Sequence, residues 1–349
     1  MSGNSFGEIF RITTWGESHG KGVGVVIDGC PSEIPLDEAV IQSMLDRRRP
    51  GKSIASTTRK EPDRAIIMSG VFEEKTTGTP IMIMVDNKDP DSRAYLPYAD
   101  QFRPGHGDIT YDAKYGNRDW RGGGRASARE TVARVAAGAV AKAILERENI
   151  EIVAYTAELG GIRPRICDLG VVSDNAFCCP DMEAAGEMEE RVSAVRKQGN
   201  SLGGIVEIVV RNVPAGLGEP VFDKLDADLA KAIMSIGAVK GVEIGAGFDA
   251  TTKLGSENND PITPEGFSSN HAGGILAGIS NGDDVVVRAA VKPIPSIAIE
   301  QNTIDTSGNA VTISMKGRHD ISAIPRINVV CEAMVCLVLA DHLLRQRAS

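Results

Sequence analysis

Residues 103–131 combine a histidine, a run of arginines and three consecutive glycines in the sequence RPGHGDITYDAKYGNRDWRGGGRASARET. The glycines at 122–124 allow tight backbone turns. Ser127 and Glu130 follow with the S-x-x-E spacing of a capping box, which predicts a helix start. A glycine loop that leads into a helix presents free N–H groups to an anion, and nearby arginines are disfavoured by the helix dipole without one. The segment therefore predicts a phosphate or carboxylate site, although the G-K-[ST] ending of a Walker A loop is missing.

His106 is the first candidate for acid–base chemistry. It lies between Gly105 and Gly107, with Arg103 and Asp108 beside it. Cationic neighbours hold the pKa of an imidazole down or near neutral, which suits proton transfer. A lone histidine of this kind is more often an exposed loop residue. The surrounding glycines and arginines favour the functional interpretation.

His19 is the second candidate. It lies in the loop WGESHGKG, between segments 8–14 and 23–27, which we expect to pair as a hairpin. Gly16 and Gly20 let the backbone bend closely around a ligand. On this segment alone, a solvated hairpin tip is an equally good interpretation. A third histidine, His271, has no acidic partner nearby in the sequence, so we expect a structural role for it.

The hydrophobic pattern predicts the elements that position these residues. The apolar spacing from Val132 to Ile144 predicts a helix with one buried stripe, and a helix over 36–48 ends in three arginines, which invite a phosphate. Further predicted helices cover 181–198, 223–236 and 334–344, and predicted strands cover 66–72, 80–85, 151–159, 204–211, 285–291 and 311–315. We expect an α+β fold with antiparallel strands, and one domain over residues 1–349 because no repeat or linker is visible.

Composition narrows the class of protein. The net charge of −9 over 349 residues argues against a general nucleic-acid or anionic-membrane binder. The six cysteines show no C-x-x-C pair and no Cys/His ligand spacing, so we expect no metal site and a reduced, cytoplasmic protein. The N-terminus has no apolar signal core. Glu332 and Asp341 interrupt the apolar C-terminal run, which predicts a buried helix and no membrane span.

Six motifs together closely resemble the chorismate synthase family. They are GESHG at 16–20, RRRPG at 47–51, RPGHGD at 103–108, RGGGRASARET at 121–131, SNHAGGILAGIS at 269–280 and KGRHD at 316–320. The resemblance extends over residues 7–347. It implies a carbon–oxygen lyase of the shikimate pathway of aromatic amino acid biosynthesis. That enzyme converts 5-enolpyruvylshikimate-3-phosphate to chorismate by 1,4-anti elimination of phosphate and requires reduced FMN without net redox change. It also implies a single-domain β-α-β sandwich, with helices between antiparallel sheets, assembled as a homotetramer.

The resemblance also implies roles for individual residues. His106 would keep the reduced flavin correctly protonated, and His19 would protonate the departing phosphate. The polar residues that would serve the flavin N5 as proton acceptor are Ser18, Ser127 and Asp320. The substrate, with one phosphate and two carboxylates, would be bound by Arg48, Arg103, Arg129 and Arg134. The FMN-binding residues would be Arg125, Ala126, Ser127, Gly237, Ala238, Gly278, Lys292, Pro293, Ile294, Pro295, Ser296 and Arg318.

Some positions depart from the usual family pattern. Ile54 stands where relatives often carry a second arginine after RRRPG, Ala126 replaces a common serine, and Gly237 replaces a common asparagine. KPIPS stands for KPTSS, and GRHDIS stands for GRHDPC. None of these changes removes an expected acid or base. We therefore expect them to tune cofactor binding without abolishing the chemistry.

Two other classes of function remain open at this point. RGGGR with Tyr111, Tyr115 and Trp120 nearby suits an RNA-binding module, but the acidic net charge and 4% aromatic content weigh against it. A scaffold that has lost activity is disfavoured because the acid–base candidates are all present. No G-x-G-x-x-G follows a predicted strand, so we expect a separate flavin reductase in place of an intrinsic NADPH site.

Overall fold

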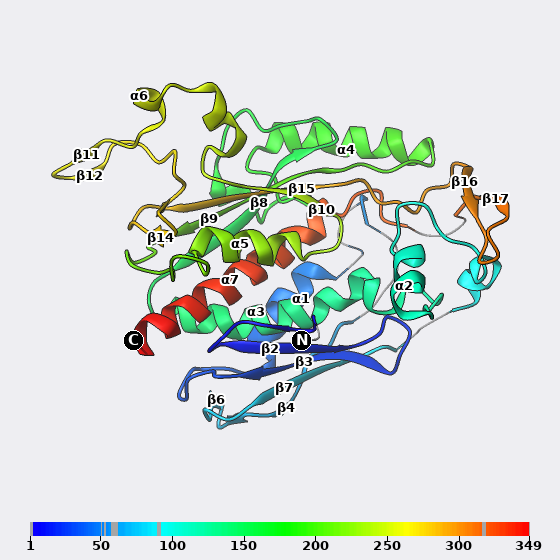
Figure 1. Ribbon diagram of the computed structural model, residues 1–349, viewed down its shortest axis with the longest axis horizontal. Coiled ribbons are helices and arrows are strands. Elements are labelled where there is room, and N and C mark those ends of the chain that lie inside the picture. The colour runs from blue at the N-terminus through cyan, green and yellow to red at the C-terminus, as the bar shows by residue number, and fades with distance from the viewer. Residues whose placement is uncertain are drawn as a thin grey trace.

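Two antiparallel sheets enclose a layer of helices (Figure 1). The computed structural model describes residues 3–49, 51, 54–56, 62–88, 92–315 and 319–348. One sheet has five strands in the order β1-β2-β3-β7-β4, namely β1 (Ser5–Phe6), β2 (Arg11–Gly16), β3 (Gly22–Asp28), β7 (Ile81–Asp86) and β4 (Ile66–Ser69). The other has four strands in the order β10-β15-β9-β8, namely β10 (Val239–Ile244), β15 (Val285–Val291), β9 (Gly204–Arg211) and β8 (Glu151–Leu159).

Four helices fill the space between the sheets: α1 (Glu38–Arg48), α3 (Thr131–Glu146), α5 (Leu225–Met234) and α7 (Ile324–Ala348). A fifth, α4 (Met182–Lys197), covers the outer face of the four-stranded sheet (Figure 1). The remaining helices are short, α2 (Asp108–Tyr115) and α6 (Gly255–Asn258). The fold is therefore α+β with helices between antiparallel sheets, which confirms the class expected from the sequence.

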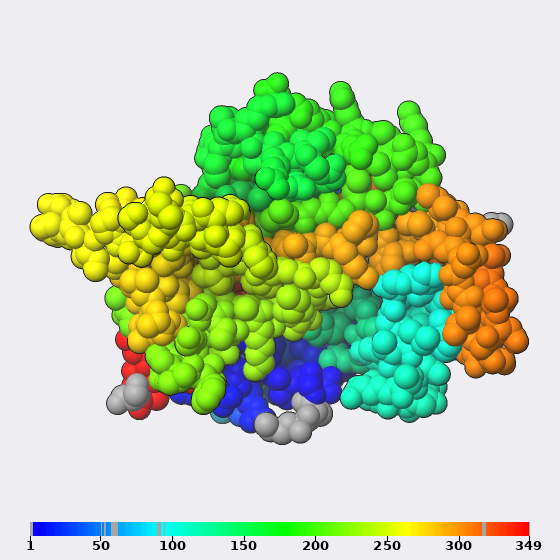
Figure 2. Space-filling model, turned by 45° about the horizontal axis from the view of Figure 1, so that its top comes forward, coloured from blue at the N-terminus to red at the C-terminus, as the bar shows by residue number. Residues whose placement is uncertain are grey.

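Small two-stranded hairpins lie outside the two main sheets. They are β5 (Val71–Phe72) with β6 (Lys75–Thr76), β11 (Ile262–Thr263) with β12 (Gly266–Phe267), β13 (Ile275–Leu276) with β14 (Ile279–Ser280), and β16 (Gln301–Ile304) with β17 (Ala310–Ile313). Figure 2 shows the yellow segment that carries β11 and β12 projecting from the body of the molecule. The loops that connect the helices and strands are thus available to form a site.

The central contact of the helical layer joins α3 to α7. A Cβ added at Gly138 would lie 2.4 Å from the Cβ of Ala333, so the two helices approach as closely as glycine permits. Helix α7 is long and apolar enough to cross a membrane, but its most apolar stretch is 100% buried in the protein. The prediction of a buried C-terminal helix is confirmed, although the helix begins at Ile324 and not near Met334. Pro325 is tolerated there because the first turn of a helix needs no N–H from it.

Two local predictions are wrong in detail. The strand expected over 8–14 begins at Arg11, because the N–H groups of Glu8, Ile9 and Phe10 bind the carboxylate of Asp341 on α7. That carboxylate takes the donors that a strand partner would otherwise satisfy. The segment 8–10 is therefore anchored to the helical layer.

The capping box at the start of α3 is only half formed. Ser127 accepts a hydrogen bond from the backbone of Arg129 and caps a 3₁₀ turn over Ala128–Glu130, and α3 begins after it at Thr131. The carboxylate of Glu130 binds Thr14 and Arg134. The charged side chain of Arg134 competes well with a neutral backbone N–H. Glu130 therefore binds neighbouring side chains in place of the helix backbone.

Candidate active site

A cavity of about 890 Å³ collects most of the residues that the sequence singles out. Its wall is formed by the N-terminal strands, the loop 103–108, the glycine loop, the first turns of α3 and α7, the end of α5 and the loop after β15. A volume of this size is typical of a small-molecule or cofactor site. The cavity therefore joins motifs that are up to about three hundred residues apart in the sequence.

Positive charge dominates the wall of the cavity. Its cationic residues are Arg48, Arg103, Arg125, Arg134, Lys231, Lys240, Lys292 and Arg326, and its acidic residues are Asp108, Glu130 and Asp320. Apolar side chains supply a second kind of surface, which includes Ile236, Ala238, Ile294 and Pro295. Cations beside a flat apolar wall suit a ligand that has both anionic groups and an aromatic ring.

His106 lies on the cavity wall with both ring nitrogens engaged. Its Nδ1 is 3.2 Å from the carbonyl oxygen of Pro104, and its Nε2 is 2.9 Å from Oγ of Ser296. A carbonyl only accepts, so Nδ1 carries the proton and Nε2 accepts from the Ser296 hydroxyl. Burial, then the charges of Arg103 and Lys292, lower the pKa of His106 to about 4. The imidazole is therefore neutral at physiological pH.

The loop that carries His106 is joined to the KPIPS segment at two further points. The ammonium group of Lys292 donates to the carbonyl oxygen of Gly105 at 2.6 Å. A Cβ at Gly105, whose φ is +71°, would lie 2.8 Å from the Cβ of Pro295. Only glycine fits this backbone conformation and this approach. The RPGHG and KPIPS motifs thus form one continuous part of the wall.

His19 lies just behind the glycine loop. It is 8% exposed, its Nδ1 is 3.2 Å from Oγ of Ser92, and its ring meets Tyr95 edge-on at 5.4 Å. A Cβ added at Gly122 would lie 2.8 Å from Nε2 and Cδ2 of His19. Gly122 lines the cavity, whereas His19 and its neighbour Ser18 do not. Because Gly122 has no side chain, only its backbone lies between the imidazole of His19 and the cavity.

Each arginine predicted to bind substrate has a protein partner in the structure. Arg103 makes two hydrogen bonds of 2.7 Å to Asp108, one from Nε and one from Nη2. Burial raises the pKa of Asp108, but the hydrogen bonds and charge of Arg103 outweigh it and hold that pKa below its usual range. Arg134 donates to Glu130 at 2.8 Å and to Oγ of Ser235 at 2.6 Å. These contacts orient the guanidinium groups on the wall.

Arg48 and Arg129 share the carboxylate of Asp63, at 2.5 Å from Arg48 Nη2 and 2.5 Å from Arg129 Nη1. Arg48 lines the cavity, whereas Arg129 lies outside its wall. The structure thus links Arg129 to Arg48 through Asp63, and the role of Arg129 in substrate binding stays a prediction. No local pattern marks Asp63, because its two partners come from distant motifs.

The glycine loop adopts the turns expected of it. Gly122, Gly123 and Gly124 have φ values of 71°, 89° and 54°, a conformation that favours glycine. Arg121 pairs with Asp119, and Arg125 donates to Oγ1 of Thr14 at 2.7 Å. The protein itself, through Asp119, thus supplies part of the negative charge that the sequence requires near this helix start.

Most residues predicted to bind FMN line the cavity: Arg125, Ala126, Ser127, Gly237, Ala238, Lys292, Ile294, Pro295 and Ser296. Pro293 and Gly278 do not. Gly278 lies in the β13–β14 hairpin, where a Cβ would lie 2.4 Å from Cγ of Lys224. Arg318 lies outside the described residues. Ile54 packs against the hydrophobic core.

Asp320 and Arg326 face the cavity from the segment that leads into α7. Arg326 donates to Oδ2 of Asp320 at 2.5 Å and to the carbonyl oxygen of Arg48 at 3.0 Å. Arg326 carries no motif that marks it in the sequence. In the sequence it is a single arginine at the start of a long apolar helix. A charged side chain in such a position needs a partner, which is the signal that could have revealed it. Lys231, Lys240 and Tyr95 also line the cavity without having been singled out.

We expected His271 to have no acidic partner nearby, and this expectation is wrong. Its Nδ1 is 3.1 Å from Oδ1 of Asp260, so it has the acidic partner that the sequence did not reveal. The same carboxylate also accepts hydrogen bonds from the backbone of His271 and Ala272 and from Ser269. The expected structural role fits this cluster, which closes the base of the projecting segment.

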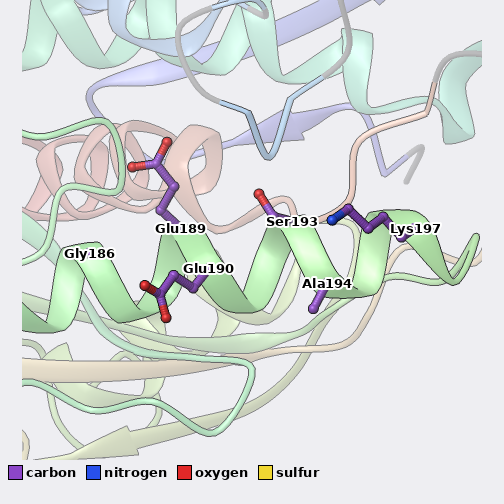
Figure 3. Close-up of a pocket in the computed structure, with 6 residues that line it drawn as sticks. All are labelled: Gly186, Glu189, Glu190, Ser193, Ala194 and Lys197. Carbon is purple, nitrogen blue, oxygen red and sulfur yellow. The ribbon is translucent and has the colours of Figure 1, made fainter.

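A second hollow, on the outer helix α4, lacks these features. Gly186, Glu189, Glu190, Ser193, Ala194 and Lys197 line it, and all come from that one helix (Figure 3). In Figure 3, Glu189 and Glu190 point away from each other. Within the described ranges, no group of three or more histidine, cysteine or acidic residues could hold a metal ion. The chemistry is therefore concentrated in the large cavity.

Comparisons with known proteins place the chain among related sequences. The family model for chorismate synthase matches residues 10–344. A chorismate synthase of Desulfosudis oleivorans is 70% identical over 349 residues, which cover 100% of this chain and 99% of that protein. A chorismate synthase of Desulfatibacillum aliphaticivorans is 65% identical over 346 residues, 99% of this chain and 97% of that protein.

A solved crystal structure of a chorismate synthase superimposes with a TM-score of 0.77 at 33% identity, covering 98% of this chain and 93% of that one. The similarity therefore includes the fold as well as the sequence. The chain belongs to the chorismate synthase family.

Proposed function

We propose that the chain converts 5-enolpyruvylshikimate-3-phosphate to chorismate by 1,4-anti elimination of phosphate, with reduced FMN bound in the cavity. The observation that carries this proposal is the cavity itself, where cations from four separate motifs line the same wall as a neutral, half-buried histidine. The substrate has one phosphate and two carboxylates. Such a ligand needs several guanidinium partners, each contributing about 1.5–3 kcal/mol through charge-assisted hydrogen bonds.

The lining residues fit a flavin. Ile236, Ala238, Ile294 and Pro295 offer an apolar surface for a ring system, and Arg125 and Lys292 offer cations for a phosphate group. A Cβ at Gly237 would meet no atom within 4 Å, which leaves open space at that part of the wall. When bound, reduced FMN would supply electron density that assists phosphate departure and a basic nitrogen, N5, for the proton on C6.

The chain's own residues then bind the substrate and manage protons. Arg48, Arg103 and Arg134 hold the anionic groups of the substrate. His106 presents a neutral imidazole to the cavity, with its Nδ1 proton held by Pro104. Ser127 and Asp320 lie on the wall, where they can carry a proton away. His19, with Ser18 beside it, lies behind Gly122 and would deliver a proton to the departing phosphate.

Several further properties belong to this proposal. We place the enzyme in the shikimate pathway, in the cytoplasm, as a homotetramer built from one domain per chain. Reduced flavin would come from a separate reductase. Single-site departures such as Ala126 and Gly237 lie on the cavity wall, so they would alter the affinity for FMN.

The test is an anaerobic assay of phosphate release and chorismate absorbance from 5-enolpyruvylshikimate-3-phosphate. One mixture contains chemically reduced FMN, and the other contains oxidised FMN with NADPH. Turnover in the first mixture alone is expected. Turnover in both would show that the chain reduces its own flavin. Turnover in neither would leave a scaffold that has kept the fold without the activity.

A further inference from the structure

Asp63 joins two motifs that are distant in the sequence. It lies just before β4, is 1% exposed, and has a φ of 43°. Its Oδ2 is 2.5 Å from Nη2 of Arg48 at the end of α1, and its Oδ1 is 2.5 Å from Nη1 of Arg129 in the glycine-loop motif. One buried carboxylate thus bridges two guanidinium groups.

The two arginines keep this carboxylate charged. Burial alone raises the pKa of Asp63, but the charges and hydrogen bonds of Arg48 and Arg129 hold it below its usual range. The carboxylate in turn offsets the repulsion that Arg129 and Arg326 exert on Arg48. Removing one partner of a buried ion pair leaves an uncompensated charge. Asp63 therefore compensates the repulsion between the two arginines that it bridges.

Arg129 fixes Asp63 to the five-stranded sheet. Its Nε donates to Oδ1 of Asn87 at 2.8 Å, and its Nη2 donates to the carbonyl oxygen of Asp86 at 3.3 Å. Both acceptors lie at the end of β7. The contacts form a continuous path from that strand through Arg129 and Asp63 to Arg48. Such a path has little freedom to move.

Arg48, which lines the cavity, retains hydrogen-bonding capacity. It is 2% exposed and lines the cavity, yet its Nε has no hydrogen-bond partner among the described residues. Its Nη1 makes only a long contact of 3.4 Å to Oγ1 of Thr131. A buried donor without an acceptor is costly unless a ligand satisfies it.

We propose that Asp63 is a positioning residue, which holds Arg48 in the orientation that binds an anionic group of the substrate. Arg129 then contributes indirectly, by fixing Asp63 to the strand end. This inference rests on the proposed function, because it takes the ligand of Arg48 to be the phosphate or a carboxylate of 5-enolpyruvylshikimate-3-phosphate. Asp63 itself is outside the cavity wall.

The test compares Asp63→Asn with Glu332→Gln. Glu332 is a matched control because it is 1% exposed and also bridges two cations, Arg47 at 2.6 Å and Lys142 at 2.9 Å, but lies away from the cavity. The dissociation constant of 5-enolpyruvylshikimate-3-phosphate is measured by calorimetry in the presence of FMN, and stability is measured by urea unfolding. Both variants should lose stability. Only Asp63→Asn should weaken substrate binding, by roughly tenfold or more.

A double-mutant cycle tests whether the effect passes through Arg48. Asp63→Asn should add little to the loss caused by Arg48→Gln, because the positioned group is already gone. Should Asp63→Asn fail to fold, Asp63→Glu keeps the charge but displaces the carboxylate, so it should still weaken binding several-fold. Wild-type affinity in either folded Asp63 variant would overturn the inference. Absence of binding and turnover in the wild-type protein would instead overturn the proposed function.

Discussion

At the scale of single residues, His106 shows how burial sets a protonation state. Burial and two neighbouring cations lower its pKa to about 4, and a backbone carbonyl and the Ser296 hydroxyl hold its two nitrogens. A neutral imidazole adds no further charge to a cationic wall, and its unprotonated Nε2 can accept a proton or a hydrogen bond. Arg103 and Lys292 therefore add to the effect of burial in keeping His106 neutral.

The low pKa of His106 has a consequence for stability. In the unfolded chain the imidazole binds a proton below a pH of about 6.5, whereas the folded chain resists it down to about pH 4. Falling pH therefore favours unfolding over this interval. Between pH 7 and pH 5, the wild-type free energy of unfolding should fall by about 2 kcal/mol more than that of His106→Gln. Urea unfolding at the two pH values measures this, and equal pH dependence would contradict the assigned state.

Gly122 provides a test of the position of His19. Gly122→Ala places a methyl group 2.8 Å from the imidazole, whereas Gly116→Ala, at a similar φ of 66°, would meet nothing within 4 Å. Both variants should lose about 1 kcal/mol or more of the free energy of unfolding, because alanine is strained in the left-handed backbone conformation. Only Gly122→Ala should lower kcat/KM, by at least about tenfold, since His19 must shift. Equal kcat/KM in the two variants would show that the position of His19 is unimportant.

At the scale of elements, the contact between α3 and α7 sets the thickness of the helical layer. Both helices begin at the cavity, so their spacing also fixes the distance between Thr131 and Arg326 on its wall. A Cβ at Gly138 would meet both the side chain and the backbone of Ala333. Small residues at one crossing thus determine how two segments of the cavity wall are held together.

This contact predicts opposite effects for two glycine substitutions in helices. Gly138→Ala forces α3 and α7 apart and should cost about 1–3 kcal/mol in the free energy of unfolding. Gly186→Ala, on α4, meets nothing within 4 Å and should gain about 0.5–1 kcal/mol from helix propensity. Urea unfolding of both variants is the measurement. A stable Gly138→Ala protein would contradict the close packing of the two helices.

The sequence predicted the elements well where their signal is local. The spacing of Val132 to Ile144 predicted α3, and strand patterns predicted β8, β9 and β15 at the bounds observed. Residues 8–10 were wrongly placed in a strand because their partner, Asp341, is over three hundred residues away. Asp63 and Arg326 were missed for the same reason. Their roles come from contacts between distant segments, which no local pattern encodes.

At the scale of the whole molecule, one hydrophobic cluster connects the two sheets. It includes Val25 of β3, Ile83 of β7, Val140 of α3, Ile208 of β9 and Leu337 of α7. Residues that share one core lose their packing together. We therefore expect a single calorimetric unfolding transition. Two separate transitions would show that each sheet forms its own domain, against the single domain proposed.

The most direct test of the central claim is a crystal structure of the protein with FMN and 5-enolpyruvylshikimate-3-phosphate. We expect both ligands in the cavity of about 890 Å³, with an anionic group of the substrate within hydrogen-bond distance of Arg48 and the flavin beside His106 and Ala238. Density for either ligand on another surface, with this cavity filled only by water, would contradict the assignment of the active site.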